Sequence, residues 1–169
     1  AIYIGRFNYS EATILELLLR AVVNARGERN LLVNNVLNVQ GRNMENTLSE
    51  ILASAEKDQD TKASFHTSIA LKHLLLARLY LIKFLDTNLT QELNRVDEEF
   101  LKMQKSIEML DHELNNPQRR MWLADVKEMK LAYIDAKNKV STIIFDRNHV
   151  ISNQLDKVGP EIASIVEDM

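Results

Sequence analysis

The sequence lacks cysteine and is poor in glycine and proline. Its 169 residues contain no cysteine, four glycines and two prolines. Without cysteine there can be no disulfide, no thiolate metal ligand and no cysteine nucleophile. Between Gly41 and Gly159 the sole residue of either breaker type is Pro117, which leaves too few turn signals for strands joined into a sheet. We therefore expect an all-α fold.

An excess of charge of one sign is missing too. The 21 basic and 24 acidic residues are interspersed and give a net charge of −3, so no basic stripe exists that could bind nucleic acid. The most apolar stretch, Ile69 to Leu85, is interrupted by Lys72, His73, Arg78 and Lys83. These charges exclude a membrane span there. The chain opens without an initiator methionine or a signal peptide and stops at Met169 within a helical pattern, so we expect a piece of a longer protein.

Apolar residues at steps of three and four predict four helices, at about 10–57, 61–86, 89–115 and 117–168. Asp86-Thr87-Asn88 and Asn115-Asn116-Pro117 supply turn and cap chemistry between them. No glycine or proline marks the break near residues 56–61, so one continuous helix through residue 86 stays open as an alternative. The predicted core seams are Leu15, Leu18, Val22, Ala25, Arg29, Leu32, Val36, Val39, Leu48, Ile51 and Ala55 in the first helix; Leu71, Leu75, Arg78, Ile82 and Leu85 in the second; Leu89, Leu93, Val96, Phe100, Met103, Ile107, Leu110 and Leu114 in the third; and Trp122, Val126, Met129, Tyr133, Ala136, Val140, Ile144, Arg147, Ile151, Leu155, Val158, Ile162 and Ile165 in the fourth.

The helix lengths follow the order long, short, short, long. This order predicts an antiparallel up-down four-helix bundle in one unit, 1–169, whose two long helices extend beyond the short pair as a stalk. Two helices alone cannot bury apolar stripes on both partners. The stalk therefore needs a second pair, either from a dimer mate or from chain upstream of Ala1.

Two stretches of the sequence nearly repeat each other. Arg29-Asn30-Leu-Leu-Val-Asn-Asn35 corresponds to Arg147-Asn148-His-Val-Ile-Ser-Asn153, and each places an arginine in an apolar seam. A permanent cation there is costly unless an anion meets it, so Arg29 and Arg147 should converge on a small organic anion. Arg26, Arg20 and Asn148 could complete this site. The alternatives are salt bridges to Glu28, Asp146 or a partner-chain acid, or side chains that reach solvent.

A second basic group lies toward the other end of the helices. Arg78 is a third arginine in a predicted seam, with Tyr80 and Lys83 beside it. Arg119, Arg120 and Trp122 open the fourth helix and could form another anion site with it. A basic cluster at a loop is more often merely solvated.

The sequence does not favour an enzyme. A di-iron site in a helical bundle needs Glu-x-x-His on two helices, and the closest match is Asp146-x-x-His149. The remaining histidines, at 66, 73 and 112, are scattered. No phosphate loop or nucleophile elbow occurs. We therefore expect no catalytic residue, no metal and no cofactor.

The order of several short motifs resembles a known family. Ala77-Arg78-Leu79-Tyr80-Leu-Ile-Lys-Phe84-Leu85-Asp-Thr-Asn88, then a heptad helix, then Arg147-Asn148, Leu155-Asp156 and Gly159-Pro160-Glu-Ile-Ala163, resembles the periplasmic sensor region of bacterial methyl-accepting chemotaxis proteins, helical bimodular type, over about residues 30–169. The resemblance implies two stacked four-helix bundles that share two long helices, a homodimer, and flanking transmembrane helices outside this fragment. The two short helices of the membrane-proximal bundle have no counterpart in the sequence.

The sequence therefore predicts the periplasmic part of an inner-membrane chemotaxis receptor. Such a domain would bind a small organic acid through Arg29, Arg147, Asn148, Arg26, Arg78 or Tyr80 and pass a helix shift to the membrane. The input domain of a sensor histidine kinase is the nearest alternative. A helical scaffold or protein-binding bundle without a small ligand is another, although leucine would stabilise a scaffold better than arginine at the seam positions.

Overall fold

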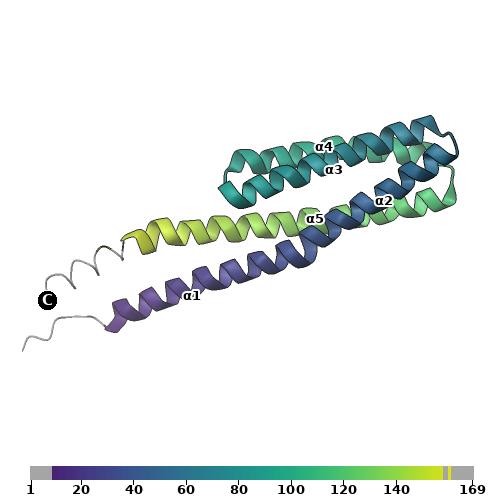
Figure 1. Cartoon of the computed structure of the whole chain (residues 1–169). Coiled ribbons are helices and arrows are strands. Elements are labelled where there is room, and N and C mark those ends of the chain that lie inside the picture. The colour runs from purple at the N-terminus through teal and green to yellow at the C-terminus, as the bar shows by residue number, and fades with distance from the viewer. Residues whose placement is uncertain (1–8, 158–159, 161–169) are drawn as a thin grey trace, which may run out of the picture. The chain divides into compact units, whose positions relative to one another are not determined.

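The chain is all-helical in the computed structural model, which describes residues 9–157 and 160 (Figure 1). The elements are α1 (Tyr9–Leu32), η1 (Val33–Leu37), α2 (Asn38–Lys57), α3 (Thr61–Thr87), α4 (Thr90–Glu113), α5 (Pro117–Val150) and η2 (Ile151–Leu155), where η denotes a π-helix. No strand occurs in the described residues, and the predicted all-α class is confirmed. The chain forms two compact units: a central unit, residues 34–137, and a terminal unit, residues 1–33 with 138–169.

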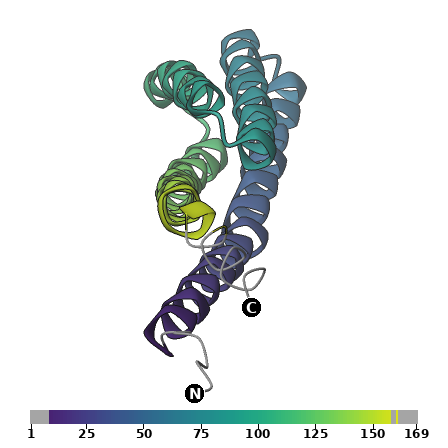
Figure 2. The same ribbon diagram turned by 90° about the vertical axis from the view of Figure 1, so that its left-hand side faces the viewer.

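The central unit consists of four helices that pack against one another. Its polar contacts give the helix directions: Lys62 near the start of α3 pairs with Glu113 at the end of α4, and Arg95 near the start of α4 donates to Tyr80 near the end of α3. These two helices are therefore antiparallel neighbours, and they lie side by side in both views (Figures 1 and 2). Lys127 with Asp111, and Lys137 with Asp97, relate α5 to α4 in the same antiparallel sense.

The core of the central unit follows the predicted seams in three of its four helices. Buried positions recur at steps of three and four along α2, α4 and α5. In α4 every predicted seam residue from Val96 to Leu110 is buried, and α5 buries Val126, Tyr133 and Ala136. These helices have polar opposite faces, so their apolar stripe has a single interpretation.

The predicted seam of α3 is wrong by one residue. Leu75 and Ile82 are 43% and 64% exposed, whereas the buried face carries small residues between larger ones. That face consists of Ala63, Thr67, Ala70, Leu74, Ala77, Leu81 and Phe84. Because α3 is apolar on both sides, its periodicity does not choose between them. The alanines fit the buried face, since small side chains let neighbouring helices approach closely.

The breaks between the helices are built from local hydrogen bonds. Gln59 adopts a left-handed conformation with φ of 56°, which ends α2 and excludes the continuous helix through residue 86. Asp60 caps α3, because its side chain accepts from the Ala63 amide. Asn88 ends α3 with φ of 57°. The Asn116 side chain accepts from the amides of Gln118 and Arg119, which confirms the predicted asparagine cap before Pro117 in the first turn of α5.

The terminal unit is described over residues 9–33 and 138–157. The predicted seam of α1, from Leu15 through Val22 to Leu32, is its half-buried face, while Leu17 and Val23 are 61% and 68% exposed. On α5 the buried residues are Val140, Ser141 and Ile144. The predicted seam residues Val158, Ile162 and Ile165 lie outside the described residues. Within the described ranges, no helix has the length and apolarity that crossing a membrane requires.

The first long helix contains an irregularity that the sequence did not predict. Residues Val33–Leu37 form a π-helix, which holds one more residue than an α-helical turn. The buried seam steps by five from Leu32 to Leu37 and continues at Gly41 and Met44. Val39, predicted to be in the seam, is 44% exposed, so that prediction is wrong. Compared with an uninterrupted α-helix, the extra residue rotates every later position of the helix to a different face.

Removing one residue from this π-helix should leave the seam intact. Deleting Asn35, which is exposed, turns the step of five into a step of four and permits an ordinary α-helix. Deleting the exposed Ser49 instead moves Ile51 and Ala55 off the core face. We expect the Asn35 deletion to change the free energy of unfolding by less than about 1 kcal/mol and the Ser49 deletion to cost more than about 3 kcal/mol, as for a buried isoleucine lost from a core. Urea unfolding followed by circular dichroism measures both; equal losses would contradict this account.

Candidate functional site

The two seam arginines of the repeated motif lie in the terminal unit. Arg29 and Arg147 are both half-buried. Burial, and then the positive charges of Arg147 and Arg26, lower the pKa of the Arg29 guanidinium from its ordinary value. Arg26 itself is exposed. Three cations therefore act on a small region of the unit, which is an environment that favours an anion.

The sequence repeat is also a structural repeat. Arg29 donates through Nη1 to Asn30 Oδ1 at 3.2 Å, and Arg147 donates through Nη2 to Asn148 Oδ1 at 2.8 Å. A π-helix begins four residues after each arginine, at Val33 and at Ile151. π-turns of this kind often occur at functional sites. The Arg-Asn repeat was evident in the sequence, whereas the shared π-helix was not, because nothing in residue type distinguishes a π-turn from an α-turn.

An open apolar groove in the same unit was not predicted. Its volume is about 640 Å³, and Leu31, Leu32 and Ile143 form its apolar lining, with Glu28 and Lys139 among its polar residues. Leu31 is 62% exposed and lies off the predicted seam. The only available signal in the sequence was that α1 carries more large apolar residues than one seam needs.

Arg78 and Tyr80 belong to the central unit and make contacts within it. Arg78 forms an ion pair with Glu45 of α2, and its stem crosses Gly41, where an added Cβ would lie 3.0 Å from Arg78 Nε. Tyr80 accepts a hydrogen bond from Arg95 of α4 at 2.8 Å, and the Arg95 guanidinium also lies over the tyrosine ring, 4.5 Å from its centroid. These two candidate site residues therefore hold neighbouring helices together.

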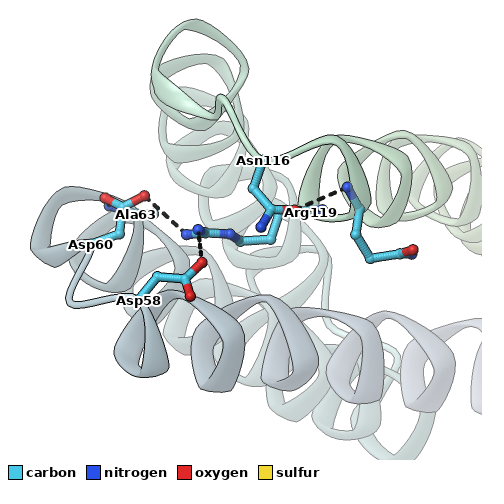
Figure 3. Close-up of polar contacts among 6 residues, drawn as sticks. Asp58, Asp60, Ala63, Asn116 and Arg119 are labelled. Atoms are coloured by element: carbon cyan, nitrogen blue, oxygen red, sulfur yellow. Dashed lines mark hydrogen bonds and ion pairs between the residues drawn. The ribbon is translucent and has the colours of Figure 1, made fainter.

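The basic cluster at the start of α5 is paired with acidic side chains of the same chain (Figure 3). Arg119 is 4% exposed and donates to Asp60 at 2.9 Å through Nη1 and to Asp58 at 2.6 Å through Nη2. Arg120 is exposed and Trp122 is half-buried. The anion that the sequence suggested for this cluster is thus provided by the loop between α2 and α3. We interpret Arg119 as a structural residue that fixes this loop against α5.

Asp60 performs two tasks that substitution can separate. One carboxylate oxygen caps α3, and the other accepts from Arg119. Asparagine keeps the capping oxygen but removes the charge, whereas alanine removes both. We expect Asp60→Ala to be about 1 kcal/mol less stable than Asp60→Asn, and both to be less stable than the wild type. Chemical unfolding measures the three free energies. Equal stability of the two variants would show that the cap contributes nothing.

A second buried charge joins α3 to α4. Glu99 is 5% exposed and accepts from Lys102 Nζ at 2.8 Å, and its other oxygen lies 2.6 Å from His73 Nδ1. Burial alone would raise the pKa of Glu99, but hydrogen bonds from Lys102 and His73 outweigh it and lower the pKa. The described residues contain no group of three or more acidic or histidine side chains arranged to hold a metal ion.

The ionised form of Glu99 should stabilise the fold in a pH-dependent way. Because its folded pKa is lowered, this stabilisation is fully present above the ordinary glutamate value of 4.5 and is lost as the pH falls through the folded pKa. We expect Glu99→Gln to cost about 1–3 kcal/mol at pH 7 and less at pH 3. Glu98→Gln, a neutralisation of the exposed neighbour, is the control and should change stability by less than about 0.5 kcal/mol at either pH. Urea unfolding at both pH values measures these differences in the free energy of unfolding. A difference between Glu99→Gln and the wild type that does not change with pH would be inconsistent with this linkage.

Comparisons with known proteins add no relative. No protein-family model matches the chain, and no curated protein or solved structure is similar to it. The arguments about function therefore rest on the residues and their geometry.

Proposed function

We propose that this chain is an extracytoplasmic ligand-binding sensor domain of the chemotaxis-receptor type, and that a small organic acid binds at Arg29 and Arg147. The observation that carries the proposal is the electrostatic coupling of these two half-buried arginines, whose positive charges repel each other. A carboxylate placed beside both guanidiniums would relieve that repulsion and could accept two parallel hydrogen bonds from either.

The central unit shows how this protein treats other buried cations. Arg119 meets two aspartates, and Lys137, which is 4% exposed at its side chain, meets Asp97 at 2.5 Å. In the terminal unit, burial and then the charges of two cations, Arg147 and Arg26, lower the pKa of Arg29. This clustering of like charge supports a binding role for the arginine pair, because in a partly desolvated region it costs stability that a bound anion can restore.

The neighbouring groove supports an organic anion rather than an inorganic one. It offers an apolar surface from Leu31, Leu32 and Ile143 in the unit that holds the arginines. A ligand with a hydrocarbon body and one or more carboxylates suits such a combination, since apolar contact and charge-assisted hydrogen bonds both contribute to affinity.

The proposed output is a small shift of α5. Helices that pack along a seam slide by about 1–2 Å more readily than they deform, and Arg147 lies on α5 directly before the π-helix η2. We propose that the long α1–α2 and α5 segments extend as the stalk of an up-down bundle. In this proposal the protein lies in the periplasm, and transmembrane helices outside the fragment receive the shift. The input domain of a sensor histidine kinase would use the same residues in the same way.

A purely structural helical bundle is the second candidate. It is favoured by one observation: the half-buried Arg78 and the buried Arg119 are both paired with acidic side chains of the central unit. In that case Arg29 and Arg147 would be scaffold residues and no small anion would stabilise the protein.

Ligand binding can be tested by thermal unfolding in the presence of acetate, succinate, citrate and free amino acids. A compound at 100 times its dissociation constant should stabilise the protein by about 2.7 kcal/mol. Arg147→Ala should abolish the shift. Arg42→Ala is the matched control, because Arg42 is exposed on α2 and its loss removes the same charge.

The outcomes separate the two candidate functions. A shift that survives in Arg147→Ala but is lost in Arg78→Ala would move the site to the central unit and contradict the proposed one. The absence of a shift with every compound would favour the structural bundle.

A further inference from the structure

The outward face of α3 carries an apolar stripe that the core does not use. Its members lie at steps of three and four, which is the a and d spacing of a coiled-coil helix. All six are exposed, with exposed fractions of 61% for Phe65, 43% for Leu75, 46% for Leu79 and 64% for Ile82. The stripe consists of Phe65, Ser68, Lys72, Leu75, Leu79 and Ile82.

The neighbouring helix α4 has a mainly charged outer face instead. Its exposed positions include Glu98, Lys105 and Glu108, and its exposed leucine, Leu101, stands among charged residues. Single exposed apolar residues need no explanation, whereas a row of them along one helix marks a contact surface.

A groove lies beside the middle of the stripe. It has a volume of about 400 Å³, and α2 contributes Leu52 while α3 contributes Leu71, Lys72, Leu75 and Leu76. The stripe therefore has a hollow at its centre, into which side chains of a second helix can pack as knobs into holes.

The stripe is complementary to itself in the antiparallel direction. If a second α3 is laid against the first with a two-fold axis between positions 73 and 74, positions 65, 68 and 72 face positions 82, 79 and 75 of the other copy. Phe65 then meets Ile82, Ser68 meets Leu79, and the stem of Lys72 meets Leu75. An apolar pair of Phe65 and Ile82 thus forms at each end of the contact, Leu79 and Leu75 face Ser68 and the stem of Lys72, and the axis passes through the hollow.

Charges at the two ends of the stripe agree with this register. Lys62 and Asp86 lie at opposite ends of α3 and are both exposed, and the two-fold brings Lys62 of one copy next to Asp86 of the other. A parallel arrangement would set Lys72 directly against Lys72, which a coiled-coil seam disfavours. We propose that α3 pairs antiparallel with α3 of a second copy of this chain.

The contact area is small, so we expect the association between the two copies to be weak. The stripe is about 26 Å long at 1.5 Å per residue, and one helix presents a strip about 10 Å wide. This is a few hundred Å² per copy, below the roughly 800 Å² per partner of a standard interface. The association is therefore reversible and concentration-dependent, of the kind that forms when copies are held close together.

Cross-linking tests the register, and the absence of natural cysteine makes single introduced cysteines unambiguous. Ser68→Cys and Leu79→Cys, one of them carrying a size tag, should cross-link with a short bismaleimide when mixed. Neither should cross-link with itself, because each position lies about 16 Å along the axis from its own copy, which is 11 residues at 1.5 Å. Lys105→Cys on α4, mixed with either variant, is the control and should stay uncross-linked. Self-cross-linking of Ser68→Cys, or no cross-link in the mixture, would overturn the proposal.

Sedimentation velocity of the cysteine-free protein gives a second, independent measurement. Over concentrations from about 10 μM to about 1 mM, the wild type should show a rising average mass. Leu79→Glu should lose this rise in mass, because it places a charge in the seam. Leu101→Glu, the same replacement at an exposed leucine of α4, should behave as the wild type. A wild type that stays monomeric throughout, or association that Leu79→Glu leaves unchanged, would overturn the proposal and assign the stripe to a different molecule.

Discussion

The central unit depends on one constraint: a charge removed from water must meet a partner of opposite charge or a strong hydrogen-bond acceptor. Arg119, Lys137 and Glu99 are all 5% exposed or less, and each reaches across to an adjacent helix or loop. Apolar residues would pack in several neighbouring registers with little difference in free energy. An ion pair between helices does not allow such a slip, because a shift by one turn would leave the buried charge of the pair without its partner. The paired charges therefore select the register that the apolar core then stabilises.

The terminal unit treats the same constraint differently. Burial, and then the nearby charges of Arg147 and Arg26, lower the pKa of its half-buried Arg29. Partly buried like charges are unfavourable in the free protein and are typical of sites where a bound ligand offsets their cost. A core that only needed stability would have leucine at these positions. Arg119, which meets two aspartates, is a structural cation, whereas the role that we propose for Arg29 and Arg147 is to bind an anion. Sequence position alone did not identify the partners of Arg119, because Asp58 and Asp60 lie 61 and 59 residues away.

The features that were predictable from sequence are those where one helix face differs clearly from the other. The heptads of α4 and the stripe of α5 are flanked by charged residues, so their buried positions followed directly, as did the Asn116 cap. The seam of α3 was not predictable because leucine occupies both of its faces. The face that is buried is the one whose alanines let the neighbouring helices approach closely. Val39 was misplaced for another reason: the π-helix at 33–37 adds a residue to a turn, and no residue type announces it. The partners of Arg78 and Arg119 lie on other elements, and only the folded arrangement brings them together.

The error on α3 carries information about association. A helix inside a monomer needs one apolar face, and α3 has two, of which the alanine-rich one serves the core and the one from Phe65 to Ile82 remains exposed. Exposed leucine and phenylalanine reduce solubility, so a sequence that keeps them at strict three-four spacing retains them against a cost. Lys72 in the middle of the stripe limits that cost: its charge keeps the isolated copy soluble, while its stem can still cover an apolar neighbour when two helices meet. Lys72 therefore makes a reversible contact between copies physically reasonable, and it links the two-sided composition of α3 to a role that the fold of a single copy does not require.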